Sequence, residues 1–399
     1  RIGQAGSVTQ RFLSVRLVRE RRQAAATLAI AGSGEDFALV RAALTRLRDA
    51  VTQLPEDPWL LISETPDSTS DERRGVLAPA QAVAQQVVAS ANGSDLVGIY
   101  AAGTLYRGFA NSFGQRNWHE ADSFNFDWSL HLDADKAVKT GYAGFDWEQA
   151  AFESKFDSAK EQLALLASPR RTIEPGEYRA YLAPRALEEL AGMICWGGFS
   201  ARARATRQSP LLRMEHGETL ARQITLRENT ADGVAPRFQS DGFVKPPSVM
   251  LIAGGRLGDA LASPRSAREY GLATNAANAG ESPESLDMAP GALASDAVLA
   301  ALDTGLYLGN LWYLNYSDRP AGRVTGMTRF ATFWVEHGRI VAPVNAMRFD
   351  DSIYRMLGEN LIDLTREREL LLDTSTYDAR STRSAHLPGA LLRALRFTL

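Results

Sequence analysis

The chain lacks a second cysteine and long apolar runs, and each absence excludes a class of protein. Cys195 is the only cysteine among 399 residues, so no disulfide can form within the chain. No apolar run approaches the roughly 20 residues that a membrane-spanning helix needs. No signal peptide is visible either. We therefore expect a cytoplasmic protein that has no membrane segment.

The sequence also lacks an excess of charge of either sign. Its 44 basic and 47 acidic residues leave a formal net charge of −3, which argues against a nucleic-acid partner. Lysine supplies only five of the basic residues, and the arginine- and alanine-rich composition is typical of a GC-rich bacterial genome. Hydrophobic residues make up 45% of the chain, which is the proportion expected of a globular protein with a large core.

Apolar periodicity predicts a first α+β domain over residues 1–168. Residues 7–20 and 22–30 alternate as a hairpin of half-buried strands, and a β-rich stretch follows two helices. We expect this domain to lack its first residues in the sequence, because the first strand lies close to Arg1. The predicted helices cover 35–53, 78–91 and 147–167, and the remaining predicted strands cover 95–101, 104–113, 121–132 and 136–143.

A linker at 169–175 leads to a second, β-rich domain over residues 176–399. Residues 229–300 of this domain are rich in Gly, Ser, Pro and Asn, and so long an irregular stretch is more often functional or interface-forming than idle. The predicted fold class is α+β, with mixed and antiparallel sheets and flanking helices. The predicted strands of this domain cover 177–182, 304–316, 322–336 and 339–345, and the predicted helices cover 185–195 and 351–364.

The helix predicted at 185–195 has the outline of a zinc-peptidase helix that has lost its histidines. A zinc-binding helix needs two imidazoles with a carboxylate beside them. In the run LEELAGM at 187–193, Glu188 and Met193 stand where the histidines would be, and Glu189 supplies the carboxylate. A carboxylate and a thioether do not replace two imidazoles in a tight zinc site. We therefore expect no metal and no catalytic residue at this helix.

The histidines leave one alternative open. His119 and Glu120 begin like a metallopeptidase motif, but the next five residues contain no histidine. No two of the five histidines lie within eight residues of each other. A metal site assembled from distant residues is not excluded by spacing alone. An independent enzyme with such a relocated site would use His119, Glu120, His131 and His216.

Aromatic and polar residues gather in the predicted strand at 304–316 and just beyond it. On a regular strand, Trp312, Leu314 and Tyr316 share one face while Tyr313 and Asn315 share the other. Aromatics on both faces fit either a strand buried on both sides or a strand that lines a peptide-binding surface. In the second case an extended peptide would be held by strand addition. The candidate substrate-binding residues are Trp312, Tyr313, Asn315 and Ser317.

Two blocks of the sequence carry a resemblance to the TldD/PmbA family of bacterial metallopeptidases and related subunits. Residues 98–132 contain a strand, a glycine turn and a second strand, with the core NSFG at 111–114. Residues 304–344 contain the run TGMT at 325–328, the hairpin EHGRI at 336–340 and the pair PV at 343–344. Both blocks are similar to family motifs, and the resemblance extends over essentially the whole chain.

The resemblance implies which zinc ligands of the catalytic branch this chain lacks. In the catalytic branch the helix reads like LHExxGH, and a cysteine near the C-terminus supplies a third zinc ligand. Leu187, Glu189 and Gly192 match that helix, whereas Glu188 and Met193 replace its histidines. No cysteine follows Cys195. The chain therefore resembles the PmbA (TldE) branch, whose members lack the zinc ligands.

The resemblance also implies a role and a partner. The chain is expected to be the non-catalytic subunit of a cytoplasmic zinc protease complex that acts on unfolded peptides. It would hold no cofactor itself, with zinc in a TldD-like catalytic partner. Two alternatives stay open. One is an independent peptidase with a relocated metal site, and the other is a non-enzymatic homodimer that binds peptide.

Overall fold

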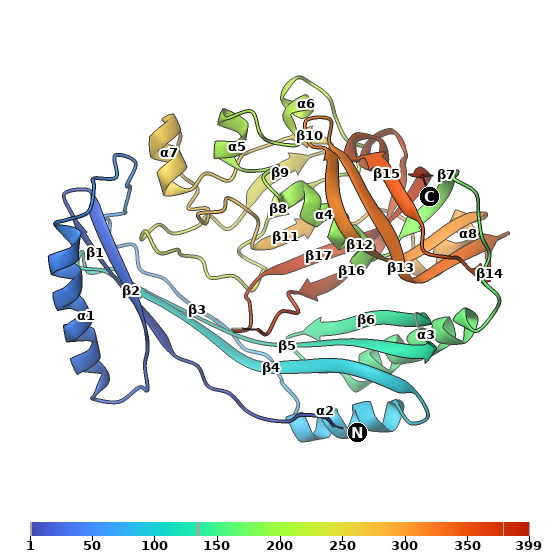
Figure 1. Ribbon diagram of the computed structural model, residues 1–399, viewed down its shortest axis with the longest axis horizontal. Coiled ribbons are helices and arrows are strands. Elements are labelled where there is room, and N and C mark those ends of the chain that lie inside the picture. Colours follow the sequence, from blue (N-terminus) through green and yellow to red (C-terminus); the bar gives the residue numbers. More distant parts are fainter. Residues whose placement is uncertain (1, 134–135, 378, 399) are drawn as a thin grey trace.

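The computed structural model describes residues 2–133, 136–377 and 379–398. The chain opens with a two-stranded antiparallel hairpin, β1 (Phe12–Arg19) and β2 (Arg22–Ala29), as its alternating pattern predicts. Helix α1 (Asp36–Val51) packs against both strands, and it buries Ala43, Leu47 and Val51, which recur at helical spacing. This unit forms one end of the molecule (Figure 1).

A four-stranded sheet follows, with the order β3-β5-β4 and β6 pairing with β5. One face of β5 carries Phe124, Phe126 and Trp128, and the last two pack on Phe152 and Phe156 of helix α3. Alternation along β5 therefore leaves its other face for polar residues. The elements of this part are β3 (Ser70–Arg73), α2 (Ala80–Ser90), β4 (Asp95–Ala110), β5 (Arg116–Asp133), β6 (Lys136–Gly144) and α3 (Gln149–Leu166).

The second half is built on a sheet that contains eleven of the described strands. Its main path runs β10-β9-β8-β11-β17-β15-β13-β12-β7, with β14 beside β13 and β16 beside β17. The strands are β7 (Gly176–Leu182), β8 (Leu226–Glu228), β9 (Val249–Ala253), β10 (Arg256–Leu257), β11 (Ser285–Met288), β12 (Gly305–Asp318), β13 (Arg323–Glu336), β14 (Arg339–Pro343), β15 (Arg348–Ser352), β16 (Leu361–Leu372) and β17 (Ser384–Phe397).

Short helices join and cover these strands. The longest of them, α4, lies against β12 and β17, and its apolar side belongs to the largest core cluster of the chain. Figure 1 shows α4 in the centre of this half, above β17 and β16. The helices are α4 (Pro184–Cys195), α5 (Ala201–Ala205), α6 (Leu212–Glu215), α7 (Pro264–Tyr270) and α8 (Val298–Leu302).

The observed strands and helices correct two predictions. The helix predicted at 351–364 is wrong, because β15 ends there, a short π-helical turn (Arg355–Glu359) follows, and β16 begins at Leu361. Gly358, at φ −106° and ψ −109°, interrupts the helical conformation at that point. The strands predicted at 95–101 and 104–113 form one continuous strand, β4, in which Gly103 adopts φ +140°.

A turn at His337 and Gly338 is confirmed between β13 and β14, where both residues have positive φ. Within the described residues, no helix is long and apolar enough to cross a membrane.

Candidate functional site

Helix α4 starts at Pro184, whose fixed φ suits the first helical position. Its buried face consists of residues spaced three or four apart, which is the pattern of a helix that lies on a core. The opposite stripe carries Arg185, Glu188, Glu189 and Gly192. The buried residues are Ala186, Leu187, Leu190, Ala191, Met193 and Ile194.

The two positions that would hold zinc histidines carry a carboxylate and a thioether in different surroundings. Met193 is 7% exposed and lies in the core, and its carbonyl accepts a hydrogen bond of 2.5 Å from the Tyr316 hydroxyl. Glu188 lies on the other side, toward the N-terminal sheet. The side chains present at these positions therefore do not fit a zinc ion.

The outer stripe of α4 meets an ion cluster, defined here as Arg185, Asp127 and Lys139. Arg185 Nη1 lies 3.4 Å from Asp127 Oδ1, and Lys139 Nζ lies 3.4 Å from Asp127 Oδ2. Asp127 belongs to β5 and Lys139 to β6. Arg185 reaches them across Gly141, where a Cβ would stand 2.0 Å from Arg185 Nη2. Glycine at 141 therefore leaves the space that the guanidinium occupies.

Burial changes the titration of the two glutamates beside this ion cluster. Desolvation raises the pKa of Glu188 to about 7, the nearby Arg185 partly opposes the rise, and Glu189, Asp373 and Asp127 add to it. Desolvation also raises the pKa of Glu189, although that residue is exposed. A carboxyl with a pKa near 7 exchanges its proton at physiological pH.

The third ligand of a zinc site is not supplied by cysteine. Cys195 is partly buried at the end of α4, and desolvation raises the pKa of its thiol to about 12, so that it is not a thiolate at neutral pH. Among the residues that the structure describes, no group of three His, Cys, Asp or Glu side chains is placed to hold a metal ion.

The histidines of the relocated-site alternative are held in separate places. His119 is 5% exposed, and its Nε2 lies 3.0 Å from the carbonyl of Val234. Desolvation lowers the pKa of this imidazole. Glu120 points to the other face of β5, and its Oε1 accepts a hydrogen bond from Trp118. His131 lies twelve residues further along β5, and His216 follows the short helix α6.

The aromatic segment of β12 is more exposed than a regular strand predicts. Two residues of β12, Tyr313 and Leu314, oppose the single residue Gly326 of β13, which is a β-bulge. Tyr313 has φ +57°, a rare conformation for a bulky residue. Because of the bulge, Leu314 packs on the core, while Trp312 is 48% exposed and Tyr313 is 76% exposed. The predicted alternation of faces is therefore wrong at this point.

Side chains around the bulge form a polar and aromatic surface. The Arg329 guanidinium lies 4.1 Å from the ring centroid of Trp312, which is a cation–π contact. Asn315 and Ser317 are exposed further along β12. Tyr316 joins this segment to the end of α4 through its hydrogen bond to Met193. The four candidate substrate-binding residues therefore share one exposed stretch of β12, next to α4.

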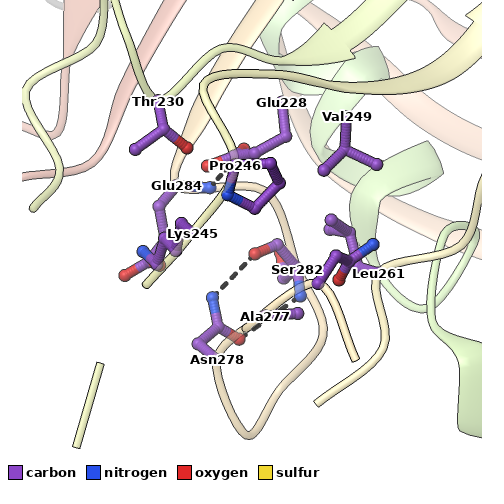
Figure 2. Close-up of a pocket in the computed structure, with 11 residues that line it drawn as sticks. Glu228, Thr230, Lys245, Pro246, Val249, Leu261, Ala277, Asn278, Ser282 and Glu284 are labelled. Atoms are coloured by element: carbon purple, nitrogen blue, oxygen red, sulfur yellow. Dashed lines mark hydrogen bonds and ion pairs between the residues drawn. The ribbon is translucent and has the colours of Figure 1, made fainter. Parts of the chain in front are cut away.

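The loop-rich stretch predicted at 229–300 lines a small cavity. Lys245 is 5% exposed and forms an ion pair with Glu284, while Glu228 accepts hydrogen bonds from the backbone of Glu284 and Ser285. Figure 2 shows these side chains converging on the cavity. Its volume of about 10 Å³ leaves room for one water molecule. It is therefore too small for a peptide or a cofactor.

Comparison with known proteins identifies the class. The model of the PmbA/TldA metallopeptidase C-terminal domain matches residues 175–398. That match covers more than half of the sequence, so the chain belongs to the PmbA/TldD family. No curated protein matches the sequence.

Solved structures share the fold over nearly the whole chain. TldE from Thermococcus kodakarensis superimposes with a TM-score of 0.77 at 13% identity, covering 97% of this chain and 90% of that one. A candidate modulator of DNA gyrase from Bacteroides thetaiotaomicron gives 0.76 at 14% identity, covering 96% and 87%. Another from Thermotoga maritima gives 0.73 at 13% identity, covering 97% and 89%. At these identities the likeness shows the fold alone.

The sequence predicts helix α4, but it does not predict which residues of the N-terminal sheet contact this helix. Asp127, Lys139 and Gly141 are distant in sequence from Arg185, and only the folded sheet brings them to it. The sequence contains one signal of this contact, because Asp127 stands between the aromatic residues Phe126 and Trp128 and therefore lies on the opposite face of β5. That signal marks a polar face, but it does not say which helix covers it.

Proposed function

We propose that this chain is a non-catalytic, TldE-like subunit that works with a zinc-bearing TldD-like partner in the cytoplasm on unfolded peptides. The observation that carries the proposal is that α4 has Glu188 and a buried Met193 where two zinc histidines would stand. Met193 is buried in the core, and Glu188 lies near Arg185 and Asp127. A carboxylate and a thioether in place of two imidazoles support a subunit that holds no zinc itself.

In this role the chain binds substrate rather than cleaving it. Trp312 and Tyr313 present exposed aromatic surface on β12, and Asn315 and Ser317 add hydrogen-bonding groups. Aromatic and polar side chains on a strand suit the capture of an extended peptide with low sequence selectivity. The chain would form a heterodimer with its partner, and a homodimer that binds peptide without cleavage is the competing assembly.

The test is a cleavage assay with defined components. The purified chain, a TldD-like protein that carries the HExxxH helix, and the mixture of both are each incubated with a fluorescent unfolded peptide. We expect no cleavage by the chain alone, and more cleavage by the mixture than by the partner alone. A partner variant with its motif glutamate changed to glutamine is the control. Cleavage by the isolated, metal-free chain contradicts the proposal.

A further inference from the structure

Strand β4 forms a long, open edge of the N-terminal sheet. It contains 16 residues, and among the strands of the described residues it pairs with β5 alone. Figure 1 shows β4 on the outer side of β5, away from the second half of the chain. In an antiparallel ladder every second residue directs its N–H and C=O groups to the same side, so about half of these groups in β4 point away from β5. Such an edge can pair with a further strand.

The features that usually protect an edge strand are missing from β4. Exposed edges are normally short or bulged, or they carry proline or lysine. β4 has neither of these residues, and its register with β5 shows no shift along its whole length. Two arginine side chains bond to its backbone from outside the ladder. Arg107 Nη1 donates to the Tyr106 carbonyl at 2.9 Å, and Arg380 Nη1 donates to the Gly103 carbonyl at 2.8 Å. The other outward groups of β4 have no described partner.

The charges of β4 are complementary to each other in one antiparallel register. The only charged residues of the strand are Asp95 and Arg107, which stand near its opposite ends. Both are exposed, and neither forms an ion pair within the part of the chain that the structure describes. If two copies of β4 pair about Ala101, Asp95 of each copy lies opposite Arg107 of the other. Twofold symmetry therefore forms the same ion pair twice.

The apolar residues of β4 fit the same register. Val97 and Ile99 lie on one face of the strand and are 63% and 61% exposed. Pairing about Ala101 places Val97 opposite Leu105, so two branched apolar side chains meet. It also places Ile99 opposite Gly103, so a large side chain meets a residue that has none. Each exposed apolar side chain therefore gains a cross-strand neighbour that leaves room for it.

We propose that two copies of this chain associate along β4, in the antiparallel register centred on Ala101, and join their N-terminal sheets into one continuous sheet. The partner is a second copy rather than an unrelated strand, because the two ends of β4 complement each other in charge. The proposal goes beyond the proposed function, since the pairing uses neither α4 nor the exposed stretch of β12. Its failure would leave the proposed role in a peptide-cleaving complex intact.

Sedimentation velocity of the full chain over a range of concentrations tests the association. We expect a dimer that dissociates on dilution, with twice the chain mass of 43.5 kDa. Arg107→Glu places like charges opposite each other at both ends of the pair, so it should raise the Kd of the dimer at least about 10-fold at low ionic strength. Asp95→Arg should have the same effect.

A charge swap and a surface control complete this experiment. The double variant with Asp95→Arg and Arg107→Glu restores opposite charges, and it should return the Kd to within about 3-fold of that of the unaltered chain. Glu161→Lys on the exposed surface of α3 changes the net charge as much as Asp95→Arg does, and it should leave the Kd unchanged.

Cysteine cross-linking tests the register. Directly opposite residues of antiparallel strands have Cα atoms about 4.5–5.5 Å apart, which suits a disulfide. Ala101→Cys should therefore form a covalent dimer on mild oxidation, because residue 101 meets its own copy on the symmetry axis. Tyr106→Cys is the matched control, since each copy lies five residues from the axis and the two are about 33 Å apart along the strands. The unaltered chain, which retains Cys195, gives the background.

A chain that stays monomeric at every concentration overturns the proposal. A dimer whose Kd does not respond to Arg107→Glu, or is not restored by the charge swap, overturns it as well. Equal cross-linking of Tyr106→Cys and Ala101→Cys would also contradict the register. If an added unfolded peptide slows hydrogen exchange of the β4 amides in a monomeric chain, the edge binds peptide and the pairing of two copies is wrong.

Discussion

The guanidinium of Arg185 lies 3.4 Å from the carboxylate of Asp127, so the first turn of α4 is joined to the N-terminal sheet by an ion pair. Both side chains are less than a quarter exposed. In a partly buried pair, removing one member leaves the other charge without compensation. Helix α4 is therefore connected to the neighbouring sheet by a side chain of its own first turn, Arg185.

Gly141→Ala tests this connection without changing any charge. The added Cβ would stand 2.0 Å from Arg185 Nη2 and 2.9 Å from the carbonyl of Phe126, so Arg185 has to move away from Asp127. We expect a loss of roughly 1–3 kcal/mol in the free energy of unfolding, as for other overpacked sites. Urea denaturation measures it.

A double-mutant cycle with Arg185→Ala supplies the control for this prediction. If the cost of Gly141→Ala arises from displacing Arg185, most of it should vanish when residue 185 is already alanine. Additive effects of the two changes would show that the contact between them is not the cause.

Glu188→Gln should make stability less dependent on pH. The pKa of Glu188 is raised from 4.5 to about 7, so the folded chain holds the proton more tightly than the unfolded chain does. Below pH 4.5 the carboxyl is protonated in both states and contributes no difference. As pH rises toward 7 the folded state loses stability relative to the unfolded state, and above 7 the loss is complete.

The glutamine variant does not ionise and escapes that loss. We expect it to be more stable than the unaltered chain by about 3 kcal/mol at pH 8 and equal to it at pH 4. Thermal unfolding across this pH range measures the difference, with Glu161→Gln as the exposed control. A gain of the same size at both pH values would mean that ionisation of Glu188 is not responsible.

Local patterns predicted most of the elements, because each amphipathic segment shows its own period. The hairpin of β1 and β2, helices α1 to α4 and strands β12 to β14 all lie where apolar spacing places them. The exception at 351–364 has a local cause, since its apolar residues fit helical spacing until Gly358 leaves the helical conformation and β16 begins.

Long-range relationships could not be read in the same way. The absence of histidines at Glu188 and Met193 was visible in the sequence, but the burial of Met193 and the surroundings of Glu188 depend on how α4 packs. The partnership of Arg185 with Asp127 depends on a sheet whose strands lie more than 40 residues earlier in the chain. The bulge at Tyr313 also has no local signal, because tyrosine rarely adopts positive φ.

Glu281 should be essential to the loop-rich part of the second domain. It is 1% exposed, and its carboxylate accepts hydrogen bonds from the Ser200 hydroxyl at 2.5 Å, the Arg202 amide at 2.9 Å and both the amide and hydroxyl of Ser263 at 2.9 Å. Ser200 and Ser263 are the N-cap residues of α5 and α7. One carboxylate therefore connects the starts of two helices.

We expect Glu281→Gln to lower the free energy of unfolding by about 2–4 kcal/mol at pH 7, because the amide nitrogen cannot accept these hydrogen bonds. These bonds lower the pKa of Glu281 below 4.5. Its stabilising effect is therefore full above pH 4.5 and is lost as pH falls through the folded pKa. The difference in free energy of unfolding between the variant and the unaltered chain should become smaller in acid. A difference that stays constant down to low pH would refute the role of the charge.

Tyr313→Gly should separate stability from binding. Glycine adopts φ +57° without strain, and the tyrosine side chain is 76% exposed, so little packing is lost. We expect the free energy of unfolding to rise by about 0.5–1 kcal/mol, because the cost of positive φ is relieved. If Tyr313 contacts peptide, the same variant should bind an unfolded peptide more weakly. Unchanged peptide affinity would remove Tyr313 from the binding surface.

The central claim is that α4 has lost the capacity to hold zinc, and zinc content tests it most directly. The purified chain is exposed to zinc, freed of loosely bound metal and analysed by elemental analysis, beside a family member with the intact HExxxH helix as a positive control. Zinc content should be near zero per chain for this protein and near one for the control. A value near one for this chain, abolished by changing His119, His131 or His216 to alanine, would contradict the account and reveal a metal site elsewhere.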